Sequence, residues 1–125
     1  MPLYDWSQVA KEYLNPQTTR QVIHAENITV AQVHLEQGAI VPEHSHMNEQ
    51  VTFLMSGRVK LIYPDHEQIV EPGQVIQTPP NVPHRLEALE TSAAIDVFAP
   101  RRNDWIQGEG GVAETAEPAG LIHST

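Results

Sequence analysis

Short apolar runs separated by glycine and proline make up most of the chain between residues 20 and 100. The runs are rich in valine, isoleucine, threonine, phenylalanine and leucine, most of which favour β-strands. Regular turn residues around such runs are typical of an all-β sandwich or barrel. The predicted strands cover residues 20–25, 28–36, 49–55, 59–63, 68–70, 75–77, 85–89 and 92–99.

The two ends of the chain depart from this pattern. Near the N-terminus we expect a short helix or an arm, and apolar residues at helical spacing favour a helix over residues 5–13, with Trp6, Val9, Ala10 and Tyr13 on one face. From Gly108 onward the residues are small and acidic, which predicts a flexible tail over residues 108–125. A chain of 125 residues is close to the usual size of one domain, here expected over residues 1–107.

The composition narrows the possible functions. Seven Lys and Arg against 16 Asp and Glu give a net charge of −9, and such a chain offers no basic stripe for nucleic acid. The absence of cysteine excludes disulfides and thiolate chemistry. No apolar run approaches the roughly 20 residues of a membrane span, and the first residues lack a signal-peptide pattern. We therefore expect a soluble, cytoplasmic protein with no nucleic-acid or membrane partner.

Histidine supplies the candidate chemistry. His44 and His46 are two residues apart, so on a strand both imidazoles would leave the same face, together with the side chain of Gln50. His84 follows a proline-rich turn that would deliver it onto the next strand. Three imidazoles suit Zn, Fe, Ni, Mn or Cu better than Mg or Ca.

Other ligand assignments carry less weight. A histidine pair at this spacing also occurs on solvated strands, and Glu49 is an alternative fourth ligand, although strand parity points it to the opposite face. The remaining histidines are expected to be solvated or without a role: His24, His34, His66 and, in the tail, His123.

The wider spacing resembles a known family. Gly38, His44, His46, Gln50 and Gly57 resemble the first motif of the cupin superfamily. The second motif is resembled by Gly73, Pro79, Asn81 and His84, after a gap of fifteen residues. Three residues depart from the usual motifs: Gln50 stands in place of Glu, Asn81 in place of Gly and Ala88 in place of Asn. The change at residue 81 is mild, because asparagine, like glycine, can adopt the left-handed backbone conformation.

This resemblance implies a single-domain jelly-roll barrel that holds one divalent transition metal, such as Zn, Ni, Fe, Mn or Co. The implied ligands are His44, His46, Gln50 and His84. It also implies a homodimer, as is common for small cupins. Because glutamine is neutral, the full charge of the ion would be retained, which favours an anionic substrate and Lewis-acid chemistry. The missing carboxylate makes oxygen chemistry of the two-His-one-carboxylate type less expected.

A second cluster lies near the last predicted strand. Asp96 and Phe98 share one strand face, and an acid in an apolar strand costs free energy unless it is paired or has a function. Arg102 could bind a substrate carboxylate or form an Asp–Arg ion pair at the barrel rim. The aromatic residues Trp6, Tyr13 and Trp105 are expected to cover the barrel ends or a subunit contact.

The two clusters together are similar to the KdgF-type pectin-degradation cupins. Those enzymes open the ring of 4,5-unsaturated uronates released by polysaccharide lyases and give linear keto-acid sugars. The resemblance implies that Asp96, Phe98 and Arg102 form the reacting pocket beside the metal and that the substrate is a small anionic sugar acid. The alternatives are another metal cupin, such as a three-His dioxygenase, or a non-catalytic cupin that binds a sugar or effector.

Overall fold

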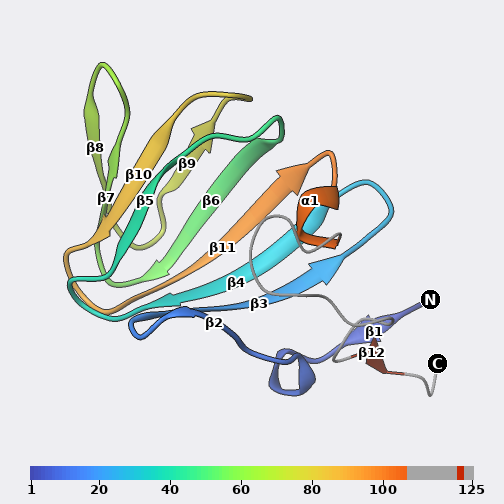
Figure 1. Ribbon diagram of the computed structural model, residues 1–125. Helices are drawn as coiled ribbons and strands as arrows, with labels where there is room; N and C mark the ends of the chain where they lie inside the picture. Colours follow the sequence, from blue (N-terminus) through green and yellow to red (C-terminus); the bar gives the residue numbers. More distant parts are fainter. Residues whose placement is uncertain (107–120, 123–125) are drawn as a thin grey trace.

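The computed structural model describes residues 1–106 and 121–122, and nearly all the regular structure in them is β (Figure 1). The first strands are β1 (Leu3–Tyr4), β2 (Glu12–Asn15), β3 (Thr18–His24), β4 (Thr29–Leu35), β5 (Ile40–His44) and β6 (Glu49–Ser56). The others are β7 (Val59–Ile62), β8 (Glu67–Val70), β9 (Val75–Thr78), β10 (His84–Ala88), β11 (Ser92–Ala99) and β12 (Leu121–Ile122). Two short helical segments are η1 (Trp6–Gln8) and α1 (Asn103–Ile106).

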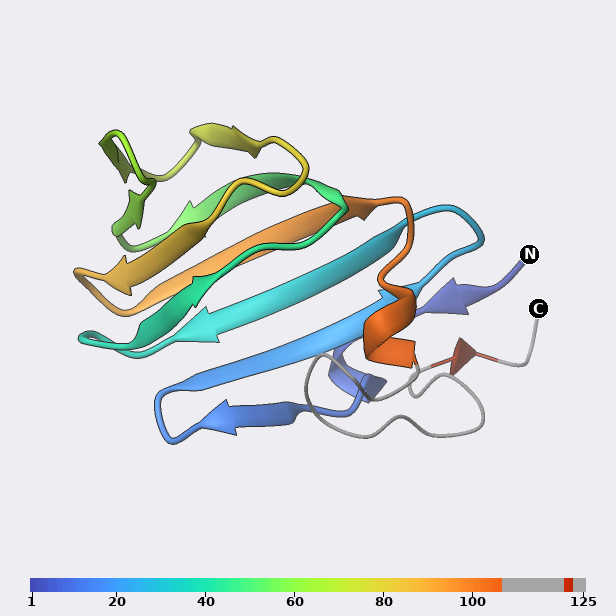
Figure 2. The ribbon, with the colours of Figure 1, turned by 45° about the horizontal axis from the view of Figure 1, so that its top comes forward.

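Two antiparallel sheets enclose a shared core. The larger has the order β2-β3-β4-β11-β6-β9, and the smaller has the order β5-β10-β7-β8. Figure 2 shows the smaller sheet as a separate layer beside β6 and β11. Leu35 and Leu54 of the larger sheet pack with Val59 and Leu61 of the smaller one. The all-β prediction is therefore confirmed, and all eight predicted strands occur with small differences at their ends.

The register of β6 against β11 brings four candidate site side chains next to one another. Phe98 lies opposite Gln50, and Asp96 lies opposite Thr52. Residues two apart on a strand share a face, so these four side chains all point to the inside of the barrel. In agreement with this direction, Thr52 is buried and Gln50 is half-buried.

The N-terminal helix is a wrong prediction. Only Trp6–Gln8 form a 3₁₀ turn, capped by the Asp5 side chain, and Glu12–Asn15 form an edge strand. The amide of buried Gln21 donates hydrogen bonds to the carbonyls of Trp6 and Val9, at 2.7 and 2.9 Å. These long-range bonds hold carbonyls that a continuing helix would need for itself.

Strand β5 is not among the predicted strands, because it contains Pro42 and proline is a common turn residue. It lies at the edge of the smaller sheet, where proline is tolerated, and its pairing with β10 shifts register close to the proline. This strand carries His44 at its end.

The predicted tail lies mostly outside the described residues. Leu121–Ile122 form β12, which pairs with β1, so at these two residues the chain is a strand. Residues 108–120 and 123–125, including His123, are outside the described part. Within residues 1–106 and 121–122, no helix has the length and apolar character needed to cross a bilayer.

Two motif glycines give a matched test of the turns. Gly57 and Gly73 both have left-handed φ values, +85° and +87°, but a Cβ on Gly57 would overlap Ser92 and the Thr91 carbonyl, whereas nothing lies within 4 Å of one on Gly73. We expect Gly73→Ala to lower the free energy of unfolding by about 1 kcal/mol and Gly57→Ala by at least about 2 kcal/mol. Urea unfolding of both variants measures the difference, and equal losses would contradict the role of the Gly57 contact.

His24 is not solvated as expected. It is half-buried, its Nδ1 lies 2.8 Å from Thr29 Oγ1, and burial, with help from nearby arginines, lowers its pKa from 6.5 to about 4. By contrast, His34 and His66 are exposed, as predicted.

The lowered pKa of His24 predicts acid sensitivity. Between pH 6.5 and about 4 the unfolded chain binds a proton that the folded His24 resists, so this residue's contribution to stability is lost as the pH falls through that range. After allowance for solvent screening, the loss is on the order of 1 kcal/mol. We expect the metal-free variant His24→Gln to lose less stability than wild type between pH 7 and 4.5 in urea unfolding. Parallel pH curves would contradict this assignment.

Candidate metal centre

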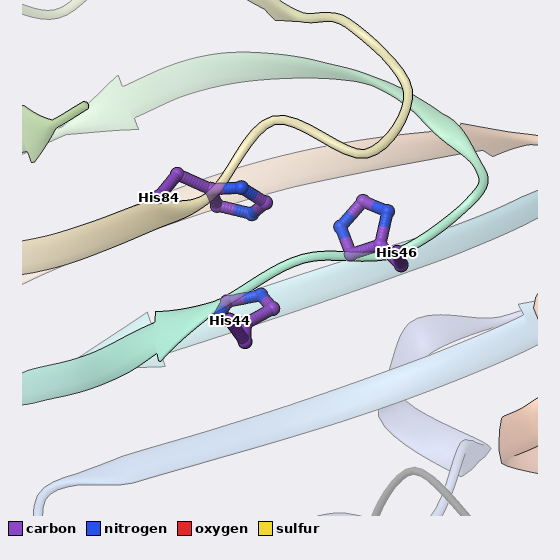
Figure 3. A group of neighbouring side chains, drawn as sticks. All are labelled: His44, His46 and His84. Atoms are coloured by element: carbon purple, nitrogen blue, oxygen red, sulfur yellow. The ribbon is translucent and has the colours of Figure 1, made fainter. Parts of the chain in front are cut away.

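Three predicted histidines converge on one point. Their rings turn toward each other from the end of β5, from the loop after it and from the start of β10, as Figure 3 shows for His44, His46 and His84. The three ligand nitrogens all lie within 4.8 Å of one another. Antiparallel pairing places His44 directly opposite His84. One ion can therefore be shared by all three imidazoles.

His46 reaches this point from a loop, which corrects the strand-parity argument. Strand β5 ends at His44, and the carbonyl of His46 accepts a hydrogen bond of 2.7 Å from the backbone N–H of Asn81. Asn81 has φ +64°, the left-handed conformation that asparagine tolerates. The second motif thus holds the first through its backbone.

Each imidazole is oriented by a backbone carbonyl. A carbonyl can only accept, so the neighbouring Nδ1 carries the proton of the neutral ring and Nε2 keeps a lone pair for a metal. The contacts are His44 Nδ1 to Pro42 O at 2.9 Å, His46 Nδ1 to Asn48 O at 3.0 Å and His84 Nδ1 to Val82 O at 2.8 Å.

The surroundings favour the neutral imidazoles that bind metals. Burial lowers the pKa of His84 to about 4, and burial together with the charge of Arg102 lowers the pKa of His46. His84 is 3% exposed, and its Nε2 has no hydrogen-bond partner among the described residues. An unpaired buried nitrogen costs about 1–3 kcal/mol, which a bound ion would offset. The donor set fits a divalent transition metal.

Gln50 offers a fourth donor. Its Oε1 lies 3.1 Å from His46 Nε2, and its amide nitrogen donates to Thr52 Oγ1 at 3.1 Å and to Asp96 Oδ1 at 3.2 Å. These bonds turn the oxygen toward the histidines. In the neutral state two lone pairs then face each other, an arrangement that a cation between them would stabilise. The alternative ligand Glu49 instead accepts a hydrogen bond from exposed Gln77 on β9.

His44 and His84 line a cavity of about 390 Å³. Asp96 lines it, and its Oδ1 accepts hydrogen bonds from Thr52, at 2.6 Å, and from Gln50. Burial raises the pKa of Asp96, while these two hydrogen bonds oppose the rise. The cavity therefore holds a carboxyl group that binds a proton more readily than a free aspartate does.

The ion-pair partner of Arg102 is Asp104, not Asp96. Arg102 is 6% exposed, and its Nε and Nη2 bind the two oxygens of Asp104 at 3.0 and 2.8 Å. The guanidinium carbon lies 4.8 Å from the Phe98 ring centroid and 4.1 Å from that of Trp105. The ion pair foreseen as an alternative thus exists within the sequence cluster, and it occupies one fork of the guanidinium.

Part of the cavity wall comes from residues that were not predicted to belong to the site. Thr18 and Arg20 of β3 line it, and Trp105, expected to cover a barrel end or subunit contact, lines it as well. The available signal was parity, because Arg20 and Val22 share one face of the predicted strand 20–25 and Thr18, two residues before Arg20, continues that face. A buried cation among such positions indicates a site rather than a solvated face.

Comparison with known proteins gives a consistent result. The cupin domain family matches residues 31–98. KdgF from Halomonas sp. is 24% identical with a TM-score of 0.76, covering 82% of this chain and 98% of that one. An RmlC-like cupin from Shewanella frigidimarina NCIMB 400 is 22% identical with a TM-score of 0.74, covering 79% and 90%.

A larger relative in structure is oxalate decarboxylase from Bacillus subtilis, described with Mn(II) centres. It is 20% identical with a TM-score of 0.69, and the match covers 80% of this chain and 29% of that one. Curated protein sequences give no match. The family match spans more than half of the chain and contains the first motif and His84, so this protein belongs to the cupin domain family.

Proposed function

We propose that this protein is a metal-dependent enzyme that opens the ring of 4,5-unsaturated uronate monosaccharides to give linear keto-sugar acids. The observation that carries the proposal is a half-buried carboxyl group, Asp96, which is hydrogen-bonded to Gln50, the neutral fourth donor beside the three histidines, and shares a cavity with Gln50, His44 and His84. The fold likeness to KdgF from Halomonas sp. supports it.

The metal would be held by His44, His46, Gln50 and His84. When bound, a divalent ion supplies Lewis-acid stabilisation of negative charge on a substrate oxygen. The three imidazoles and the amide bring no negative charge of their own. With an ion bound, this donor set would leave its positive charge uncompensated and would favour an anionic substrate, in spite of the acidic chain around it.

Asp96 would move the proton. In its ionised form it accepts the proton of the anomeric hydroxyl as the bond from C1 to the ring oxygen breaks, which leaves an aldehyde and an enolate. It then returns the proton to C4, and the enolate becomes a ketone, so the reaction is an isomerisation without net redox change. A raised pKa suits a group that must hold a proton between the two steps. Both of its hydrogen bonds within the described chain reach Oδ1, which leaves Oδ2 for substrate.

Phe98 and Arg102 would shape the reacting pocket. Phe98 is 3% exposed and packs edge-on against the His46 ring at 5.5 Å and the Trp105 ring at 5.0 Å. It provides an apolar wall that excludes water from the enolate. Arg102 adds positive charge beside this wall, fixed in place by its ion pair with Asp104.

A direct assay tests the proposal. Metal-loaded protein is mixed with unsaturated uronate, and the ultraviolet absorbance of the C4=C5 double bond is followed. Loss of absorbance without oxygen uptake is the expected result. Oxygen consumption with Fe(II) would instead indicate a dioxygenase, and ligand binding without conversion would indicate a binding protein.

A further inference from the structure

One wall of the cavity comes from β3 and α1, away from the strands that carry the metal donors. Thr18 and Arg20 are two residues apart on β3 and so share its inner face. Both line the cavity, at 1% and 4% exposure, together with Trp105 of α1. The mechanism above uses none of these three side chains.

Arg20 has a donor that no residue of the described chain uses. Its Nε donates to Glu12 Oε2 at 3.1 Å, and its guanidinium carbon lies 3.8 Å from the Trp105 ring centroid. Stacking on the ring occupies a face of the guanidinium and does not block its in-plane N–H groups, of which only the Nε group donates to Glu12 within the described chain. Within the described chain, Nη2 is buried without a hydrogen-bond partner. For a charged group this is costly unless a ligand supplies the acceptor.

Other polar atoms of the cavity wall are also buried without a hydrogen-bond partner in the described chain. In residues 1–106 and 121–122, four buried side-chain polar atoms lack a partner, and three of them belong to cavity-lining residues: Thr18 Oγ1, Arg20 Nη2 and His84 Nε2. The last is explained by a metal. Arg20 can only donate and the Thr18 hydroxyl can donate as well as accept, so a group rich in acceptor oxygens would satisfy both.

Comparison of the two cavity arginines favours Arg20 as the binding group. The Nε and Nη2 of Arg102 are taken by both oxygens of Asp104, whereas Glu12 occupies the Nε of Arg20 alone. The carboxyl groups of Glu43 and Asp96 also line the cavity and disfavour a second anion beside them. Since each arginine already has a carboxylate partner, binding here depends on charge-assisted hydrogen bonds more than on net charge.

We infer that Arg20, assisted by Thr18, binds the carboxylate of the sugar acid and so determines the preference for acids over neutral sugars. The inference rests on the proposed function for its substrate class and adds a specificity-determining residue to it. The metal and Asp96 then face the reacting part of the sugar while β3 holds its charged end.

Binding of unreactive ligands tests this inference apart from turnover. The affinities of metal-loaded protein for galacturonate and for galactose are measured by calorimetry. Wild type is expected to prefer the acid at least tenfold, and Arg20→Gln to lower that preference below threefold, with partial recovery in Arg20→Lys. Arg58→Gln, which removes an exposed arginine paired with Glu71, is the control and keeps the preference. A preference that survives in Arg20→Gln, or its absence in wild type, overturns the inference.

A second variant and a kinetic measurement test the inference independently of whether Arg20→Gln folds and of whether the proposed function is correct. If Arg20→Gln does not fold, Thr18→Val is expected to weaken galacturonate binding at least fivefold without weakening galactose binding, and equal effects overturn the inference. With unsaturated uronate, Arg20→Gln should raise KM about tenfold and leave kcat within threefold. An inactive wild type whose acid preference needs Arg20 would refute the proposed function alone. An active wild type with the same KM in Arg20→Gln would refute the inference alone.

Discussion

Replacing His84 with alanine is expected to lower the affinity for Mn(II) or Zn(II) at least 1000-fold. The change removes the most buried of three converging donors, and two imidazoles with one amide form a weak site for these ions. A 1000-fold loss corresponds to about 4.1 kcal/mol of binding free energy. Isothermal titration of the chelator-treated protein measures it directly.

Thermal unfolding provides a second readout of the same change. A ligand at 100 times its dissociation constant stabilises the folded state by about 2.7 kcal/mol, so wild type should show a clear rise in Tm at a metal concentration where His84→Ala shows almost none. His34→Ala is the matched control, because it removes an exposed histidine outside the cluster. A His84→Ala variant that binds metal as tightly as this control would refute the metal centre.

The fold was predictable because its signals are local. Strand existence follows from alternation and from turn residues, and Gly57 and Gly73 adopt the left-handed conformations that turns need. The prediction of an N-terminal helix was wrong for a non-local reason, because the side chain of Gln21, distant in sequence, donates hydrogen bonds to the carbonyls of Trp6 and Val9. Strand β5 was not predicted because the effect of Pro42 depends on whether the strand lies at the edge of a sheet, which a single sequence does not reveal.

In the candidate site, too, the features that follow from local sequence were predicted, and those that depend on contacts between distant segments were not. Histidine spacing and motif resemblance selected three side chains that do converge, but His46 arrives through a loop tied to Asn81, a contact across 35 residues of sequence. The partner of Arg102 and the cavity position of Arg20 depend on how β3, β11 and α1 pack together. Residue type indicated the chemistry, whereas the pairing of charges required the three-dimensional structure.

Asp96→Asn is expected to lower turnover of unsaturated uronate at least 100-fold, about 2.7 kcal/mol in activation free energy, while metal stays near stoichiometric. Asparagine keeps an oxygen that can accept from Thr52 and Gln50, so the orientation of the Gln50 amide is preserved. What is lost is a group that can take up and release a proton. Steady-state kinetics and metal analysis of the same sample measure both quantities.

Thr52→Val separates proton transfer from positioning. It removes the 2.6 Å hydrogen bond to Asp96 and the acceptor for the Gln50 amide, but it leaves the carboxyl group in the cavity. If Asp96 carries the proton, Asp96→Asn falls far below Thr52→Val in kcat and both keep their metal. If Asp96 serves to orient Gln50, Thr52→Val should be at least as impaired, and metal affinity should fall with it. Asp96→Asn activity within tenfold of wild type would exclude the proton-transfer role, because no other carboxyl group in the cavity is hydrogen-bonded to a metal donor in the described part of the chain.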